Sequence, residues 1–226
     1  MGKINEIYIR DTRDQLGRYP NWPINQEISL GKIGYYVGRK ATFVWETDLS
    51  KLGITIANSS AQQLMSELYT SENSVSISFD VDSSTGFSKA VFDFSKKRSV
   101  ATQGHDVGYQ VLDLDNLKTQ LLNKISKGLV WDYNWVIITE VWIASGFTTL
   151  ISNSSGSHSE ISASTRISNT AFNVADFNLG LKVTQSRKMG YQGVAEKNVQ
   201  PYFQIHRLTK DNKLKRYGLK TSFWGD

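Results

Sequence analysis

The feature that most constrains this chain is a run in which every second residue is apolar. Apolar side chains alternate with Ser or Asp over residues 74–82, and after a turn at 82–86 the alternation continues over 89–95. Successive side chains of a strand point to opposite faces, so this period predicts a β-hairpin with one apolar and one polar face. The apolar positions are Val75, Ile77, Phe79, Val81, Ala90, Phe92 and Phe94.

A second region of this kind lies within residues 135–184. A long strand that begins near Trp131 leads into this region. It is apolar on both faces and is therefore predicted to be a buried central strand. The Ser- and Thr-rich residues 152–170 and the residues after Ala175 then alternate again, which predicts a second, longer amphipathic hairpin region. Its apolar positions are Ile161, Ala163, Ile167, Phe177, Leu179, Leu181 and Val183.

The remaining elements complete an α+β prediction. Residues 1–60 suggest strands and turns, residues 61–70 a short helix, and residues 113–129 the main helix, because its leucines recur at helical spacing and Gly128 can end it. A late strand is expected around 202–208. We therefore predict a twisted, mostly antiparallel sheet with a few helices. The 226 residues are expected to form a single pore-forming-type domain, with a basic aromatic tail at 210–226.

No catalytic centre is recognisable in the sequence. The absence of Cys excludes disulfides, thiolate catalysis, Cys-ligated metals and lipid attachment through Cys. The three histidines have no metal-binding spacing, and neither a G-x-S-x-G elbow nor a phosphate-binding glycine loop occurs. We expect no enzyme and no cofactor. Glu140, inside an otherwise apolar strand, is interpreted as a structural partner for an arginine or for backbone N–H groups, with an interface or channel lining as the alternative.

Charge and strand pattern together favour a membrane as the partner. The net charge is +5, and no run is long and apolar enough for a membrane-spanning helix, so any insertion would use strands. The absence of a secretory signal predicts a cytoplasmic soluble form that then reaches the membrane. No nucleic-acid partner is expected. The residues expected to contact anionic lipid headgroups are Lys210, Lys213, Lys215, Arg216 and Lys220.

The small polar residues between the apolar positions favour conversion of the hairpins to membrane strands. A membrane strand alternates lipid-facing and water-facing residues over about 9–11 positions. An unpaired strand edge in lipid costs several kcal/mol for each group, so two hairpins of one chain cannot close a barrel of useful size. The sequence therefore predicts a large homo-oligomer.

Two stretches resemble the pore-forming domains of gasdermins. Residues 132–141, Asp-Tyr-Asn-Trp-Val-Ile-Ile-Thr-Glu-Val, are similar to a family strand in which an aspartate precedes aliphatic residues, Thr-Glu and another aliphatic residue. Residues 199–208, Val-Gln-Pro-Tyr-Phe-Gln-Ile-His-Arg-Leu, resemble a late family strand that carries Arg and Leu after Phe or Tyr. The alternating segment 74–95 falls where the family has its first hairpin, so the resemblance covers about 74–210.

The resemblance implies an α+β globule that inserts two hairpins per subunit into a large pore and kills the cell that holds it, as a cell-death or defence effector. The chain departs from the family in residues 1–60, which do not match, and in two further respects. It has no room for an inhibitory second domain and lacks the lipidated Cys of small bacterial members. The chain would then be kept inactive by an inhibitory partner or by residues 210–226 acting as a plug.

Three other functions are compatible with the sequence. The strongest is a carbohydrate- or protein-binding β-sandwich, in which Trp22, Tyr35, Tyr36 and Trp45 form a stacking platform, although tryptophan more often fills a core. A nucleic-acid binder comes next, since basic charge and aromatic residues fit, but no RRM or OB signature is present. A hydrolase comes last.

Overall fold

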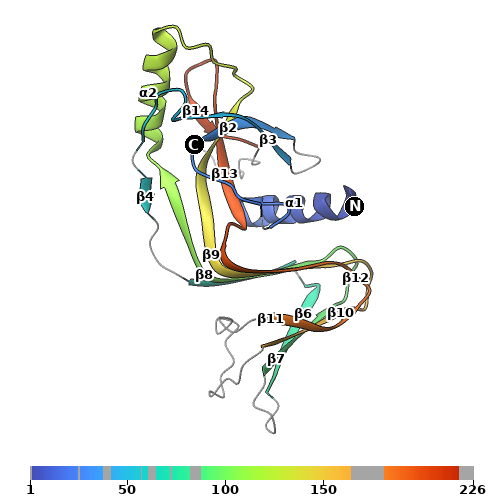
Figure 1. The fold of residues 1–226 in the computed structure, drawn as a ribbon. Helices are drawn as coiled ribbons and strands as arrows, with labels where there is room; N and C mark the ends of the chain where they lie inside the picture. Colours follow the sequence, from blue (N-terminus) through green and yellow to red (C-terminus); the bar gives the residue numbers. More distant parts are fainter. Residues whose placement is uncertain are drawn as a thin grey trace. The chain divides into compact units, whose positions relative to one another are not determined.

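The computed structural model describes residues 2–24, 26–37, 42–56, 58–60, 65–71, 73–81, 88–163 and 181–218. This part of the chain is mostly antiparallel strand with two α-helices, which confirms the α+β class (Figure 1). The chain divides into two compact units. Unit 1 comprises residues 1–11, 63–108 and 143–199, and unit 2 comprises residues 12–62, 109–142 and 200–226.

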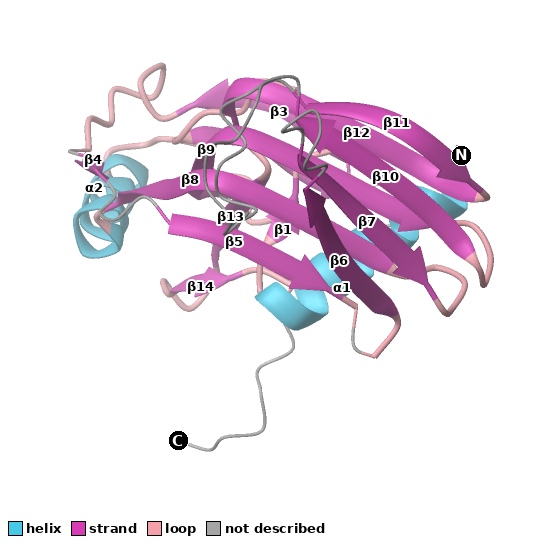
Figure 2. Cartoon of the chain, turned by 90° about the horizontal axis from the view of Figure 1, so that it is seen from below, coloured by secondary structure: helices cyan, strands magenta, loops and turns pink. Residues whose placement is uncertain are grey.

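Unit 1 contains two groups of paired strands. One is a four-stranded antiparallel sheet with the order β11-β10-β7-β6 (Figure 2). In the other, β5 pairs with β8, β8 with β9, and β9 with β12. The bounds are β5 Met65–Thr70, β6 Val75–Val81, β7 Ser88–Phe94, β8 Val100–Leu112, β9 Val136–Ser152, β10 Ser157–Ala163, β11 Leu181–Arg187 and β12 Met189–Val199.

Unit 2 is organised around β13 and the first half of β9. The strand order is β1-β13-β9-β2-β3, while β14 also pairs with β13 and β4 pairs with the end of β8. The bounds are β1 Tyr19–Pro20, β2 Lys32–Val37, β3 Thr42–Asp48, β4 Asn58–Ser60, β13 Tyr202–Leu208 and β14 Leu214–Arg216. The predicted late strand is therefore confirmed as β13, and β9 is buried along most of its length, as a central strand should be.

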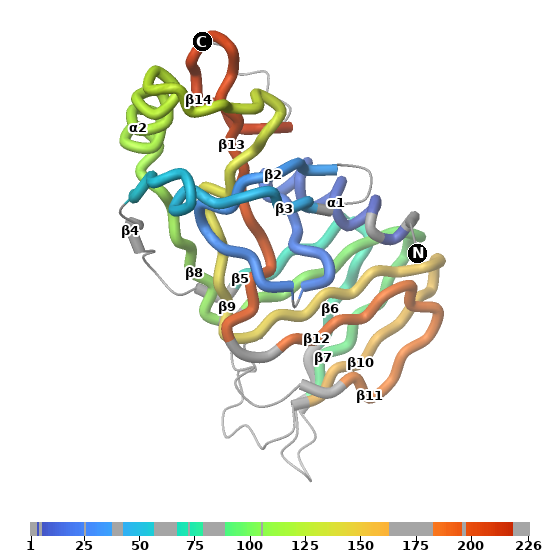
Figure 3. The backbone as a smooth tube through the Cα atoms, turned by 45° about the horizontal axis from the view of Figure 1, so that its top comes forward, coloured from blue at the N-terminus to red at the C-terminus, as the bar shows by residue number. Residues whose placement is uncertain are grey.

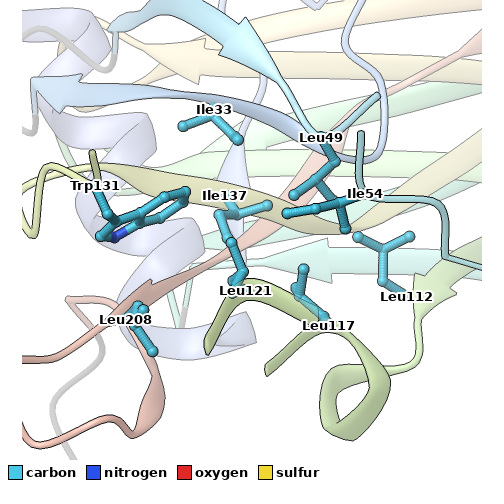
Figure 4. Packing of buried hydrophobic residues seen from close by; sticks show 9 residues of the cluster. All are labelled: Ile33, Leu49, Ile54, Leu112, Leu117, Leu121, Trp131, Ile137 and Leu208. Carbon is cyan, nitrogen blue, oxygen red and sulfur yellow. The ribbon is translucent and has the colours of Figure 1, made fainter. Parts of the chain in front are cut away.

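The predicted main helix is confirmed as α2, Leu114–Ser126, in unit 2. It begins at Asp113, whose carboxylate accepts hydrogen bonds from the backbone N–H groups of Asp115 and Asn116 at 3.1 and 3.0 Å. Gly128, with φ of +98°, follows its end. Leu117 and Leu121 are fully buried and rise from α2 toward other core residues of the unit (Figure 4). The labelled core residues are Ile33, Leu49, Ile54, Leu112, Leu117, Leu121, Trp131, Ile137 and Leu208.

The prediction of only strands and turns in residues 1–60 is wrong at its start, because Gly2–Leu16 forms the helix α1. A surface strand would bury alternate residues, yet Ile7, Tyr8 and Ile9 are all buried. Thr12, four residues after Tyr8, is buried as well, whereas Glu6 and Arg10 are exposed. This pattern fits a helix with one buried side.

The prediction of a short helix over 61–70 is also wrong for the described residues 65–70, which form β5. Residues 65–70 pair with β8 from Thr70↔Ala101 to Met65↔Val107. Leu68, which would lie on the apolar side of a helix over 61–70, is 49% exposed. An isolated helix of this length is marginal in water, so pairing with a neighbouring strand decides the conformation.

Candidate functional site

Both predicted hairpins occur, and they are joined in one sheet. β6 and β7 pair in the register Val75↔Phe94 to Val81↔Ser88, and β10 and β11 pair from His158↔Arg187 to Ala163↔Leu181. β7 also pairs with β10, from Ser157↔Phe94 to Ser162↔Lys89. We call this β7–β10 junction the seam. Figures 2 and 3 show its two strands side by side.

The apolar face of this four-stranded sheet forms the core of unit 1. Phe92 and Phe94 are each 1% exposed, and they pack with Ile161, with Ala101 of β8 and with Leu150 of β9. Val75, Ile77 and Val183 are partly buried against the same cluster. Seven of the predicted membrane-inserting residues therefore share one apolar surface. They are Val75, Ile77, Ala90, Phe92, Phe94, Ile161 and Val183.

The other seven predicted membrane-inserting residues are placed less completely. Phe79 and Val81 lie on β6, Ala163 on β10 and Leu181 on β11, and their backbones pair in register with the neighbouring strand. Their side chains are outside the described part of the structure. Ile167, Phe177 and Leu179 fall wholly outside the described residues.

Charged side chains form a connected network across the seam. His158 Nδ1 on β10 lies 2.7 Å from Asp93 Oδ1 on β7, and His158 Nε2 lies 3.3 Å from Glu160 Oε1. Glu160 Oε2 in turn lies 3.2 Å from Lys89 Nζ, back on β7. Two ion pairs therefore cross between the hairpins, and His158 connects them through Glu160. We call these four residues the seam charges.

The pKa values of the seam charges reflect these contacts. The hydrogen bond to Asp93, followed by that to Glu160, raises the pKa of His158 above its usual 6.5, although burial opposes this. Burial alone would raise the pKa of Glu160, but Lys89 and His158 outweigh it and hold that pKa below its usual value. Both shifts favour the charged forms.

Serine hydroxyls fix the base of the first hairpin. Ser74 Oγ donates to the carbonyl oxygen of Ser71 at 2.9 Å, and the backbone N–H of Ser95 donates to the carbonyl oxygen of Ser74 at 2.9 Å. Ser71 Oγ accepts from the N–H of Val100 at 2.8 Å and donates to the carboxylate of Asp11 on α1 at 2.8 Å. The segment that enters β6 is thus bonded to both β8 and α1.

The base of the second hairpin is fixed in the same manner. Ser157 Oγ lies 2.6 Å from the carbonyl oxygen of Lys188 and 2.7 Å from that of Ser154. Ser152 Oγ donates to the carbonyl oxygen of Lys96 at 2.9 Å and accepts from the N–H of Ser99 at 2.9 Å. We call these serines, with Ser71 and Ser74, the hairpin-base serines.

A cavity of about 330 Å³ lies beside the hairpin bases. Most of the residues that line it are polar in type, and they include Asp93 and Arg187 as charged groups, with Phe94 as the aromatic residue. The remaining lining residues are Asn73, Val75, Ser76, Ser95, Gly156 and Ser157.

The described part of the basic tail, residues 210–218, contains the strand β14. β14 pairs with β13 from Leu208↔Leu214 to His206↔Arg216, and Arg216 Nε donates to Gln204 Oε1 at 2.8 Å. The predicted headgroup residues Lys210, Lys213, Lys215 and Arg216 are exposed, with Lys213 Nζ 3.3 Å from Asp211, and Lys220 lies outside the described residues.

Glu140 lies near two arginines in unit 2. Burial raises the pKa of its carboxyl group, whereas the charges of Arg216 and then Arg18 oppose that rise. The Arg18 guanidinium lies 4.5 Å from the ring centre of Trp142 and 5.7 Å from that of Tyr202. These neighbours agree with the interpretation of Glu140 as a structural partner for arginine.

The four aromatic residues proposed as a stacking platform pack within unit 2. Tyr36 meets Tyr19 edge-on with ring centres 4.5 Å apart, and Trp45 packs on Phe43 at the same distance. Tyr35 donates a hydrogen bond to the carboxylate of Asp132, and Trp22 is half-buried. Tyr36 and Trp45 are thus half-buried and pack on other aromatic rings of unit 2.

The sequence reasoning missed His158 and the hairpin-base serines. In the register of β7 and β10, His158 stands opposite Asp93, but sequence alone does not set which strands of the two hairpins are neighbours. The alternation predicts Ser74 on the polar face of the first hairpin, yet Ser74 is buried, as are Ser152 and Ser157.

The described residues offer neither a metal site nor a membrane-spanning helix. No group of His, Asp and Glu side chains there could hold a metal ion. Neither of the described helices has the length and apolar character needed to cross a bilayer. Comparison of the chain with protein-family models and with curated proteins finds no match.

Proposed function

We propose that this chain is a gasdermin-like pore-forming protein that binds anionic membranes, oligomerises and inserts its two hairpins as membrane strands. The observation that carries the proposal is the joining of both hairpins in one four-stranded sheet with a continuous apolar face and a polar face. A membrane barrel needs the same division, because one face meets lipid and the other meets water.

The proposal requires each of the four strands to lengthen. β6, β7, β10 and β11 have seven residues each in the described chain. A membrane strand needs about 9–11 residues. The proposal therefore requires residues 82–87 and 164–180, which join the strands of each hairpin in the sequence, to supply the additional length in the membrane.

Insertion would move the apolar face of the sheet from the protein core into lipid, with little change in its free energy of burial. Fully burying a large apolar side chain such as Phe92 contributes about 1.5–3 kcal/mol, and lipid tails are as apolar as a protein core. Transfer of the apolar face from the core to lipid therefore costs little. The unpaired outer edges of β6 and β11 are what lipid penalises, and strands of neighbouring subunits would pair with them. A homo-oligomer on the membrane follows from this requirement.

The decisive experiment uses the absence of Cys in the chain. A single Cys is introduced at consecutive positions of β6 and labelled with an environment-sensitive fluorophore, and the protein is added to dye-loaded vesicles rich in anionic lipid. We expect lipid-attached quenchers to quench the label in Ile77→Cys but not in the neighbouring Ser76→Cys and Ser78→Cys, while dye is released. A lipid-borne quencher distinguishes lipid from protein surroundings, which matters because Ile77 is already half-buried in unit 1.

Two variants test the same face by function. Ile77→Asp should abolish dye release, because a charge on a lipid-facing position costs a few kcal/mol. Ser78→Asp, on the exposed face of the same strand, is the matched control and should retain release. Circular dichroism must show that both variants fold. Vesicles that stay sealed at high protein concentration, or quenching without alternation, would contradict the proposal.

A non-catalytic β-sandwich that binds carbohydrate or protein is the second candidate. The complete burial of Phe92, Phe94 and Ile161 favours it, since this is the usual environment of apolar side chains between packed sheets. Sealed vesicles together with glycan or protein binding would support this function.

A further inference from the structure

We infer that His158 acts as a proton-dependent clasp between the two hairpins: its protonated ring holds the seam closed, and loss of the proton loosens it. The inference extends the proposed function, since a loosened seam would let each hairpin leave the core of unit 1 before β7 and β10 pair again in the membrane sheet. Among the ion pairs of this sheet that the structure describes, His158–Asp93 and Lys89–Glu160 cross the seam, and His158–Glu160 lies along β10.

The geometry requires a charged ring. A neutral imidazole has one N–H donor and one acceptor, whereas the protonated ring has two donors. Each ring nitrogen of His158 faces a carboxylate oxygen, Asp93 Oδ1 at 2.7 Å and Glu160 Oε1 at 3.3 Å. In the neutral ring, one of these contacts must place a nitrogen lone pair against a carboxylate oxygen. Both contacts are satisfied only when the ring is protonated.

The surrounding charges are mixed, but the carboxylates lie closest. Asp93 and Lys89 face the seam from β7, and Glu160 lies on the strand of His158 itself. Arg187 of β11, which carries the same charge as a protonated histidine, stands opposite His158 in the register. Asp80 of β6 and Lys182 of β11 are the other charged residues on the outer strands, and their side chains lie outside the description.

The direction of the pH effect follows from the protonation states. His158 has a raised pKa in the folded protein, so its contribution is fully present below the usual value of 6.5 and is lost as the pH rises through the folded value. Glu160 has a lowered pKa, so its contribution is present above its usual 4.5 and is lost in more acidic solution. The seam should therefore be tightest at mildly acidic pH and weaker above neutrality.

Hydrogen exchange measured by mass spectrometry tests the clasp without a membrane. After correction for intrinsic exchange rates, we expect protection of the β7 and β10 amides in the full chain to fall between pH 6 and pH 8. The fall should reach up to about tenfold for each unit by which the pKa of His158 is raised. His158→Gln should exchange equally at both pH values. His206→Gln, which changes a histidine of unit 2, is the matched control and should keep the wild-type response. Protection that does not change with pH in the wild type, or changes equally in His158→Gln, overturns the inference.

A titration of His158 by NMR provides a second, independent measurement. Asp93→Asn leaves the fold intact in our expectation, because the Asp93 side chain is 57% exposed, and it should lower the pKa of His158. An unchanged pKa in this variant would also overturn the inference.

Vesicle leakage separates the clasp from the proposed function. Faster leakage at pH 8 than at pH 6, with no such difference in His158→Gln, supports both. A pH-dependent seam in a protein that never opens vesicles keeps the clasp and contradicts the pore. Leakage with a seam that does not respond to pH contradicts the clasp and keeps the pore.

Discussion

At the scale of single residues, the fold shifts the pKa values of His206 and His158 in opposite directions. Burial, and then the charge of Arg216, lowers the pKa of His206 to about 4, and its Nδ1 shares a hydrogen bond with Thr139 Oγ1 at 2.7 Å. The unfolded chain therefore binds a proton that the folded chain does not, and unit 2 should lose stability as the pH falls from 6.5 toward 4.

Tryptophan fluorescence is the appropriate measurement for His206, because all six tryptophans lie in unit 2. During urea unfolding we expect the free energy of unfolding to fall by about 1–3 kcal/mol over this pH range. His206→Gln should flatten the dependence. An equally steep dependence in that variant would show that another group is responsible.

Ser71 gives a residue-scale prediction in unit 1. Ser71→Ala removes the hydroxyl that serves both Val100 N–H and the carboxylate of Asp11, so two polar groups lose a partner. We expect a loss of about 1–2 kcal/mol in the free energy of unfolding, measured by hydrogen exchange of the β8 amides. Ser78→Ala, at an exposed position of β6, is the control and should change little. Equal effects of the two substitutions would contradict the role of the hairpin base.

At the scale of elements, the four-stranded sheet depends on the burial of its aromatic residues. Phe92→Ala should destabilise unit 1 by about 3–5 kcal/mol, because a fully buried ring is removed from a packed cluster. Leu68→Ala, in the same unit but 49% exposed, should cost far less. Thermal unfolding followed by circular dichroism compares the two. Similar melting temperatures would mean that the apolar face carries little of the stability.

The elements that the sequence predicted well are those whose pattern is long. The alternation over 75–94 fixes which residues of β6 and β7 share a face, and the leucines of 113–129 fix α2. β5 was missed because a six-residue segment has no decisive periodicity, and pairing with β8 determines its structure. α1 was missed because Ile7 and Ile9 imitate a strand when Tyr8 between them is ignored.

The candidate site could be predicted only in part. Period-two alternation found the apolar face but could not show that Phe92 and Phe94 pack on Leu150, which is more than fifty residues away in the chain. The seam depends on which strand of each hairpin is inside the sheet, and nothing local in the sequence determines that. Contacts across such distances arise from the fold and not from residue spacing.

At the scale of the whole molecule, the tail should govern attraction to membranes. Lys210 and Lys215 are exposed, and each lysine near an anionic surface contributes about 1 kcal/mol. Lys210→Gln combined with Lys215→Gln should weaken vesicle binding by about tenfold or more in co-sedimentation. Added salt should reduce the difference in affinity between this double variant and the wild type. Lys97→Gln combined with Lys127→Gln removes the same charge elsewhere and is the control. Equal weakening by the two pairs would assign binding to net charge alone.

The two kinds of attachment that hold the hairpins differ in their response to dissolved ions. Hydroxyl groups bonded to backbone carbonyls secure the hairpin bases, and ionised side chains secure the seam. In 1 M salt the screening length shrinks to about 3 Å, which weakens exposed ionic contacts and leaves neutral ones almost unchanged. Concentrated salt should thus let the two hairpins separate at the seam while their bases stay attached to the rest of unit 1. Urea should weaken both attachments at once.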